Sequence, residues 1–98
     1  MLKVANISDI PPLTGKVVMV EGNPVALINL GHKIIAWDNR CPHRGSSLAD
    51  GIITDKVVQC RHHLWKFGTE TGRALENSKI LIKKYSVNII GADIYLNI

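Results

Sequence analysis

Both cysteines of the chain and three of its four histidines lie in one stretch, between positions 41 and 67. Cys41 and His43 form a C-x-H pair, and Cys60 and His63 form a C-x-x-H pair after a gap. Each pair offers one thiolate and one imidazole from a tight turn. Two such turns brought together supply two sulfur and two nitrogen ligands, which is the composition of a metal site.

Zinc is the first candidate metal. Structural zinc sites use cysteine and histidine in tetrahedral geometry, but they usually pair like with like, and their ligands are two to four residues apart. Here each turn carries one ligand of each kind, and the C-x-H spacing is tighter. The spacing disfavours zinc and leaves a zinc-stabilised interaction module as an alternative.

Two further alternatives use the cysteines without a metal. A disulfide between Cys41 and Cys60 needs an oxidising compartment and leaves the histidines unexplained. A cysteine nucleophile needs an orienting third residue and a substrate cleft, which two equivalent Cys–His pairs do not resemble. The remaining interpretation is an iron–sulfur cluster, in which the two histidines bind one iron if both cysteines bind the other.

The elements that position these residues are predicted to be short strands. The 98 residues suffice for one domain, 1–98, and no helical apolar period persists for three turns. We therefore predict an all-β fold of antiparallel strands with the ligand turns at hairpin tips. β-Strand patterns or β-branched runs cover 2–5, 16–20, 24–30, 33–37, 52–53, 56–59, 80–84, 85–90 and 94–98.

Glycines and polar residues mark the predicted connections. Gly22-Asn23 and Gly31-His32 indicate two-residue hairpin loops. Residues 46–51 have room for one helical turn, with Leu48 pointing inward. Trp37, Trp65 and Phe67 lie near the ligand turns, which suggests apolar packing around the site.

The charge balance constrains the partners. Twelve lysines and arginines face eight acids, so the formal net charge is +4. The basic residues are scattered, with no basic helix or aromatic-basic stripe, so we predict no nucleic-acid binding. Arg40, Arg44, Arg61 and Lys66 flank the ligand turns and form a candidate rim for docking an acidic partner.

The sequence shows no membrane or export signal. Its first residues are not followed by the apolar region of a signal peptide, and no apolar run approaches the ~18 residues of a membrane helix. We therefore expect a cytoplasmic protein with no membrane association. In a reducing compartment, two cysteines are expected to be ligands or thiols rather than a disulfide.

The two ligand turns are similar to the motifs of a known protein family. Cys41-Pro42-His43-Arg44-Gly45 and Cys60-x-x-His63 resemble the two motifs of the Rieske 2Fe–2S family. The likeness extends to residues around both motifs, namely Trp37, Asp38, Asn39, Leu48, Gly51, Phe67, Thr71 and Gly72. It implies an antiparallel β sandwich with a small cluster-binding subdomain, about 38–72, formed by two hairpin loops.

The resemblance also implies the ligands of one 2Fe–2S cluster. Cys41 and Cys60 would hold the inner iron, and His43 and His63 the outer iron. His62 is displaced by one residue from the ligand position, and His32 lies in a predicted turn. The predicted ligand set is therefore Cys41, Cys60, His43 and His63, and it excludes His62 and His32.

The chain departs from the family pattern at three places. Leu64 stands where glycine is usual, and Arg61 stands where proline is common. The stretch 76–78 lacks the proline of a loop that often covers the cluster. These departures leave the ligands intact and concern the local shape and solvent cover of the site.

The resemblance implies an electron carrier rather than an enzyme. No histidine follows His63, so this sequence lacks the mononuclear iron site of the larger oxygenases. We expect a soluble Rieske-type ferredoxin that passes single electrons from a reductase to a terminal oxygenase or other acceptor, with no small-molecule substrate. A small subunit of a larger enzyme, similar to the nitrite reductase small subunit, is the alternative.

Overall fold

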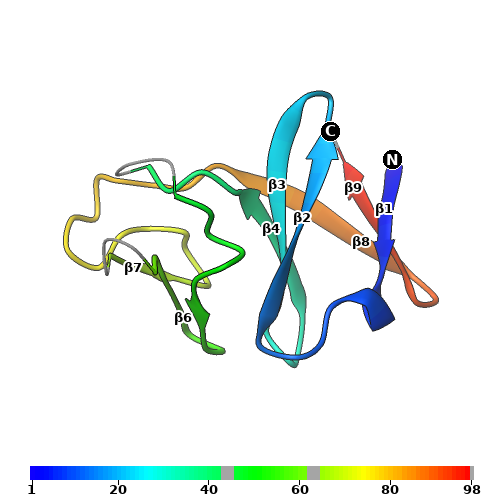
Figure 1. Ribbon diagram of the computed structural model, residues 1–98, viewed down its shortest axis with the longest axis horizontal. Helices are drawn as coiled ribbons and strands as arrows, with labels where there is room; N and C mark the ends of the chain where they lie inside the picture. Colours follow the sequence, from blue (N-terminus) through cyan, green and yellow to red (C-terminus); the bar gives the residue numbers. More distant parts are fainter. Residues whose placement is uncertain (43–45, 62–64, 98) are drawn as a thin grey trace.

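The computed structural model describes residues 1–42, 46–61 and 65–97, and within them the regular secondary structure consists of strands and one short 3-10 helix. A large and a small lobe lie side by side (Figure 1). The elements of the large lobe are β1 (Leu2–Asn6), the 3-10 helix η1 (Ile7–Asp9), β2 (Thr14–Val20), β3 (Asn23–Asn29), β4 (Ile34–Asp38), β8 (Lys84–Ile90) and β9 (Asp93–Asn97). Those of the small lobe are β5 (Ile52–Ile53), β6 (Val57–Gln59) and β7 (Lys66–Gly68).

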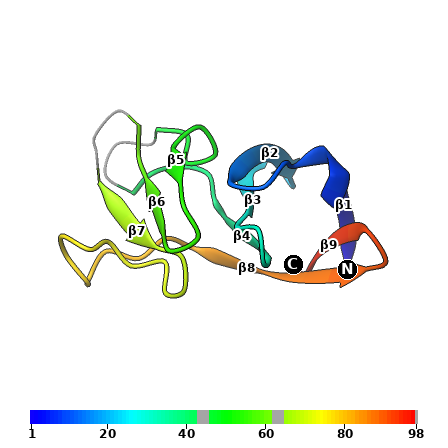
Figure 2. The same cartoon turned by 90° about the horizontal axis from the view of Figure 1, so that it is seen from below.

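Every strand pairing is antiparallel. The large lobe is a six-stranded sheet in the order β1-β9-β8-β4-β3-β2, and the small lobe is a three-stranded sheet in the order β5-β6-β7. β8 pairs with β4 at its start and with β9 along its length, so the large sheet folds over on itself (Figure 2). This arrangement confirms the predicted all-β sandwich with a small subdomain.

β3 separates two apolar cores. Because alternate side chains of a strand point to opposite faces, Val25 and Leu27 enter the core inside the large lobe. Ala26 and Ile28 enter a second core, which extends under the small lobe. This two-sided burial explains the unbroken apolar run in the sequence of β3.

One of the two predicted hairpin turns is displaced in the structure. The β2–β3 loop is Glu21-Gly22, one residue earlier than predicted, with positive φ angles of 51° and 82°, because the register of the flanking strands sets the loop. Between β3 and β4 the N–H of Leu30 donates to the carbonyl oxygen of Lys33 over 2.9 Å, and this bond closes the predicted turn at Gly31-His32.

The predicted helical turn over 46–51 does not form. A single hydrogen bond of 3.1 Å, from the N–H of Gly51 to the carbonyl of Leu48, closes one turn there. Leu48 points inward as predicted and is fully buried. The residues before it pair with the chain that leaves β4, so the backbone stays extended instead of coiling.

The stretch 80–84 joins a regular strand only at Lys84, where β8 begins. Before that, residues 73–83 form an irregular pair of extended segments, which we call the arm. Arg73 and Leu81 form an isolated antiparallel bridge, and the N–H of Ala74 donates to the carbonyl of Ile80 over 2.9 Å. Figure 1 shows this segment passing around the outer side of the small lobe between β7 and β8.

Across the described ranges, the structure has no helix of the length and apolar character that crossing a membrane requires.

Candidate metal centre

The first ligand loop is a hairpin that continues directly from β4. Arg40 pairs with Ser47 in an isolated antiparallel bridge. Inside this bridge, the backbone N–H of Cys41 donates to the carbonyl oxygen of Ser46 over 2.8 Å. Outside it, the N–H of Leu48 donates to the carbonyl oxygen of Asn39 over 2.8 Å. These contacts fix both ends of the loop and place Cys41 at its first position.

The second ligand loop is closed in the same way. β6 and β7 pair through Gln59 and Lys66, and the N–H of Cys60 donates to the carbonyl oxygen of Trp65 over 2.7 Å. In both loops the cysteine directly follows a paired residue and bonds to the residue five positions later. The two loops therefore begin and end as equivalent hairpins, with a cysteine at the same point of each.

Both cysteines are buried in one apolar cluster. Cys41 is 2% exposed and Cys60 is 0% exposed, and they share the cluster with Trp37, Leu48 and Phe67. In the described part of the chain they are not joined by a disulfide. A thiolate is costly to bury among apolar groups unless a positive centre binds it. This pair therefore fits the two sulfur ligands of one buried metal ion.

Aromatic side chains pack in the same cluster, as the sequence predicted. Trp37 and Phe67 are almost fully buried, and the half-buried Trp65 packs against the cluster. The ring centroids of Trp65 and Phe67 are 6.4 Å apart, with 41° between the ring planes. The aromatic rings add apolar volume around the cysteines, which limits the access of water.

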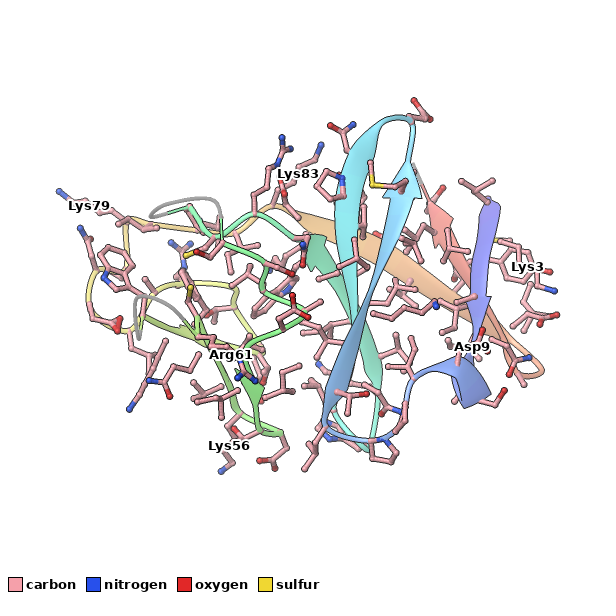
Figure 3. All side chains as sticks on the ribbon, viewed as in Figure 1. Lys3, Asp9, Lys56, Arg61, Lys79 and Lys83 are labelled. Carbon is pink, nitrogen blue, oxygen red and sulfur yellow. The ribbon has the colours of Figure 1, made fainter. Side chains whose placement is uncertain are left out.

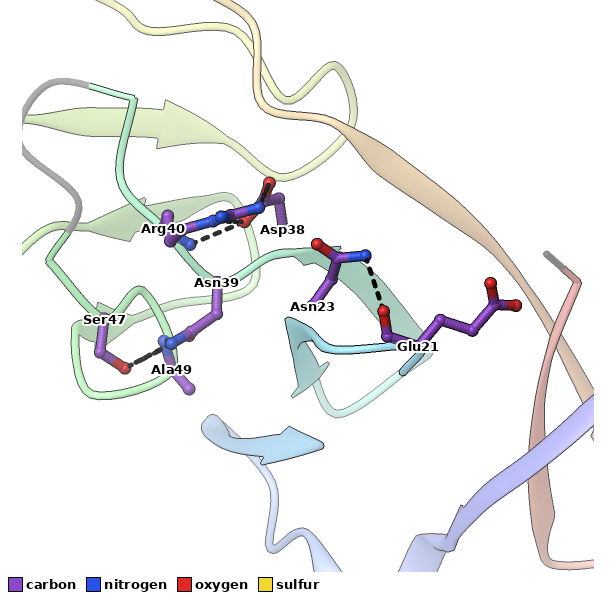
Figure 4. Close-up of polar contacts among 7 residues, drawn as sticks. All are labelled: Glu21, Asn23, Asp38, Asn39, Arg40, Ser47 and Ala49. Atoms are coloured by element: carbon purple, nitrogen blue, oxygen red, sulfur yellow. Dashed lines mark hydrogen bonds and ion pairs between the residues drawn. The ribbon is translucent and has the colours of Figure 1, made fainter. Parts of the chain in front are cut away.

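Asn39 ties the first loop to the large lobe. This side chain is only 7% exposed. Its oxygen accepts a hydrogen bond of 2.9 Å from the N–H of Ala49, and its nitrogen donates to the hydroxyl of Ser47 over 3.0 Å (Figure 4). Its backbone N–H donates to the carbonyl of Pro24 in β3 over 3.0 Å. The sequence analysis included Asn39 in the family pattern but missed this role.

Asp38 and Arg40 form an ion pair at the entrance to the first loop. Nε of Arg40 lies 3.1 Å from Oδ1 of Asp38, and Nη2 lies 3.1 Å from Oδ2 (Figure 4). Partial burial acts to raise the pKa of Asp38, but the hydrogen bonds and charge of Arg40, with a smaller contribution from Lys83, outweigh it. The pKa of Asp38 is therefore lowered.

The predicted positive rim around the loops is partly neutralised. The charge of Arg40 is balanced by Asp38, and Nε of Arg61 donates to the backbone carbonyl of Asp50 over 2.8 Å. Lys66 is exposed beside the second loop. Arg44 lies outside the described residues.

The arm is anchored at the end of the second loop. The N–H of Leu75 donates to the carbonyl of Lys66 over 2.9 Å, and the N–H of Lys66 donates to Oε1 of Glu76 over 3.0 Å. Phe67 and Ala74 form a bridge beside these contacts. The sequence analysis noted only the missing proline here, because no local pattern indicates that Glu76 caps a distant strand.

The structure brings together half of the predicted ligand set. Cys41 and Cys60 lie in one core, whereas His43, His63 and the neighbouring His62 lie outside the described residues. His32 is exposed in the β3–β4 loop, as predicted. Within the described ranges, which include only these two predicted ligands, no group of three or more His, Cys, Asp or Glu side chains is placed to hold a metal ion.

Two equivalent hairpins that bring buried cysteines into one core of an all-β protein define a metal-centre protein built from paired loops. A family model described as the Rieske 2Fe-2S domain matches residues 1–85. The chain belongs to the Rieske 2Fe–2S family, and its cofactor is one 2Fe–2S cluster of the Rieske type. The resemblance inferred from the two motifs is therefore confirmed.

Several relatives are ferredoxins of dioxygenase systems. The chain is 30% identical over 95 residues to the ferredoxin subunit of 3-phenylpropionate/cinnamic acid dioxygenase from Escherichia coli strain K12, covering 94% of this chain and 88% of that protein. It is 34% identical over 86 residues to the ferredoxin component of the naphthalene 1,2-dioxygenase system from Pseudomonas aeruginosa, covering 83% and 79%.

A third relative is much longer. The chain is 38% identical over 71 residues to the oxygenase subunit of 3-chlorobenzoate-3,4-dioxygenase from Comamonas testosteroni. The match covers 62% of this chain and 16% of that protein. The shared part is thus a small portion of that oxygenase subunit.

Solved structures share the whole fold. A structure titled as a complex of reduced oxygenase and oxidised ferredoxin in carbazole 1,9a-dioxygenase matches with a TM-score of 0.86 and 27% identity, covering 97% of this chain and 90% of the matched chain. A structure titled as a nitrite reductase small subunit matches with a TM-score of 0.87 and 21% identity, covering 99% and 97%. At that identity the second match supports the fold alone.

Proposed function

We propose that the chain is an electron-transfer protein whose 2Fe–2S cluster is held by Cys41, Cys60, His43 and His63. The observation that carries this proposal is the equivalent closure of the two loops, which places both cysteines in one buried cluster. The cysteines would hold the inner iron and the histidines the outer iron. His62 and His32 have no ligand role in this assignment.

The ligand set determines what the cofactor contributes. When bound by two thiolates and two imidazoles, such a cluster accepts one electron at a higher potential than an all-thiolate cluster does. The chain itself contributes burial, since Cys41 and Cys60 are held away from water among aromatic and aliphatic side chains. It also contributes rigidity, since both loops are closed by backbone hydrogen bonds.

The partners follow from the relatives' names. Two relatives are ferredoxin components of dioxygenase systems, and one similar structure is a complex of a ferredoxin with an oxygenase. These relatives support the proposal that the chain receives electrons from a reductase and delivers them to a terminal oxygenase. In this role the chain is a carrier and not itself a catalyst. Residues 1–98 would form one domain, with β8 linking the two halves of the large sheet. The cytoplasmic location stays a prediction.

The experiment that tests the ligand assignment compares single variants. Cys41→Ser, Cys60→Ser, His43→Ala and His63→Ala are each expected to lose the red-brown visible spectrum and the EPR signal of the reduced cluster. His32→Ala and His62→Ala are the matched controls and are expected to keep both signals, with unchanged iron and sulfide content. A His62 variant that loses the cluster while the His63 variant keeps it would overturn the assignment.

A small subunit of a larger reductase remains the second candidate. It is favoured by exposed apolar side chains on the arm, where Leu75 is 62% exposed and Leu81 is 47% exposed. A permanent subunit would bury such residues against a large chain. Co-purification from the native host at constant stoichiometry through gel filtration would support this candidate, and a protein that elutes alone would support the carrier.

A further inference from the structure

The net positive charge of the protein lies entirely in the segment between β4 and β8. Residues 39–83 contain eight lysines and arginines and four acids, whereas the rest of the chain contains four of each. The segment 39–83 therefore carries the whole net charge of +4. The part of the molecule that holds the ligand loops is basic, and the rest is neutral overall.

The arm carries three of the eight lysines and arginines of this segment. In the described part of the chain, the two ion pairs are Lys3–Asp93 and Arg40–Asp38, so the lysines of the arm are not neutralised by direct pairing. Lys83 lies over the ring of Tyr85, with 5.1 Å from Nζ to the ring centroid. Lys79 extends away from the ribbon at the outer end of the small lobe (Figure 3).

The arm has one buried face and one exposed face. Ala74 and Ile82 are each 2% exposed and pack into the core of the small lobe with Ile80. The side chains that alternate with them point outward, and they combine two leucines with three cations. This exposed set, which we call the arm face, consists of Arg73, Leu75, Lys79, Leu81 and Lys83.

The arm is joined by hydrogen bonds to the ends of both ligand loops. The N–H of Leu75 donates to the carbonyl of Lys66, directly after the second loop. The N–H of Asp38, shortly before the first loop, donates to the carbonyl of Lys83 over 2.9 Å. A protein seated on the arm face would therefore lie beside the residues from which both loops extend.

We propose that the arm face is the docking site for a protein redox partner with an acidic surface around an apolar centre. Leu75 and Leu81 supply the apolar contact, and the surrounding Lys79 and Lys83 supply the charge complementarity. Arg73 adds its positive charge while its guanidinium donates to the backbone carbonyl of Ser78 over 2.8 Å. This proposal rests on the proposed electron-transfer function. It shifts the docking site from the predicted rim, where the charge of Arg40 is balanced by Asp38, to the arm.

The test uses the cluster-loaded full chain and two protein probes of opposite charge. Cytochrome b5 presents acidic residues around its haem, and cytochrome c presents lysines. The double variant Lys79→Glu/Lys83→Glu is compared with Lys16→Glu/Lys33→Glu, which makes the same charge change on exposed residues of the large lobe. Stopped-flow absorbance measures the reduction of each cytochrome by the dithionite-reduced protein over a range of ionic strengths.

For the natural sequence, the rate with cytochrome b5 is expected to fall as salt rises, because screening weakens steering. The arm variant is expected to lose about tenfold in this rate at low salt, and the control less than about threefold. A loss no larger than that of the control would overturn the docking proposal while the electron-transfer function stands. A protein that takes up no cluster, or reduces neither cytochrome, would instead overturn the function.

Two further results test the chemistry of the face. Leu75→Ser/Leu81→Ser is expected to lower the rate with cytochrome b5 even at high salt, where apolar contact persists, and an unchanged rate would remove the leucines from the proposal. The docking proposal would be overturned if the protein with the natural sequence bound a short DNA duplex, if Lys79→Glu/Lys83→Glu abolished that binding, and if both cytochromes were reduced at equal rates. The arm face would then be assigned to nucleic acid.

Discussion

Gly51 packs directly against Gln59, so that a Cβ atom at position 51 would overlap the carbonyl oxygen of Gln59. Gly51 follows the first ligand loop, and Gln59 immediately precedes Cys60. The neighbouring residue Ile52 pairs with Gln59 in the small sheet. This contact brings the exit of one ligand loop against the entrance of the other, and it requires a residue without a side chain.

We expect Gly51→Ala to destabilise the protein by about 1–3 kcal/mol, because the backbone must shift to relieve the overlap. The shift moves Cys60, so the purified protein should also contain less iron and sulfide. Urea unfolding and metal analysis measure the two effects. Asp50→Ala, at an exposed neighbouring residue, is the control and should change neither. A Gly51→Ala protein with full stability and a full cluster would show that the contact is dispensable.

Asn39→Ala is expected to cost about 1–3 kcal/mol, because it leaves the buried N–H of Ala49 without its acceptor. The same change should broaden the EPR signal of the reduced cluster, since the first loop loses the hydrogen bonds that hold it to the large lobe. Asn39→Asp keeps the acceptor oxygen and should restore most of both properties. Equal behaviour of the two variants would contradict a positioning role for this amide.

The predictable part of the fold is the part set by local patterns. β-Branched runs located most strands, because alternating burial within a strand leaves a visible period in the sequence. Spacing alone indicated that Cys41 and Cys60 begin two similar turns, and the structure confirms that these turns close alike. The ligand role of the histidines stays a prediction.

The features that were missed depend on contacts between distant residues. The two-sided burial of the arm is hidden in its sequence, because apolar Leu75 and Leu81 occupy exposed positions between buried ones. The role of Asn39 depends on Pro24 and Ala49 approaching it from different elements. Charge type could be counted from the sequence, but the pairing of Arg40 with Asp38 emerged only from the folded geometry.

The ion pair at the first loop predicts a dependence of stability on pH. The folded pKa of Asp38 lies below the ordinary value. The contribution of the ionised Asp38 to the unfolding free energy is therefore complete above a pH of about 3.9, and it is lost as the pH falls through the lower folded pKa. The contribution is expected to be below about 1 kcal/mol. The difference in unfolding free energy between the natural sequence and Asp38→Asn should narrow on acidification, and a gap that widens would contradict this sign.

The reduction potential should lie in the lower part of the Rieske range of roughly −150 to +300 mV. In high-potential members, hydroxyl groups that donate hydrogen bonds to the cluster and its ligands raise the reduction potential, and Phe67 has no hydroxyl. The chain also has only two cysteines, so no second pair can form a disulfide between the loops once both are ligands. A spectroscopic redox titration measures the midpoint, and a value well above zero would contradict the prediction.

Removal of the cluster should loosen the small lobe before the large one. β5, β6 and β7 contain only two, three and three residues, and such short strands are marginal without added support. The core that includes both cysteines lies between β3 and the small lobe, whereas the core inside the large lobe is formed by other side chains. Loss of the metal therefore removes a link within one core only.

Hydrogen exchange measured by mass spectrometry tests this difference. The holoprotein is compared with the apoprotein, which is prepared by removing iron with acid and chelator and returning the protein to neutral pH. Peptides from 46–61 and 65–83 should exchange at least about tenfold faster in the apoprotein, and peptides from β1 and β9 should change little. The Cys60→Ser variant should reproduce the apoprotein pattern without chemical treatment. Equal loss of protection in both lobes would mean that they unfold as one unit.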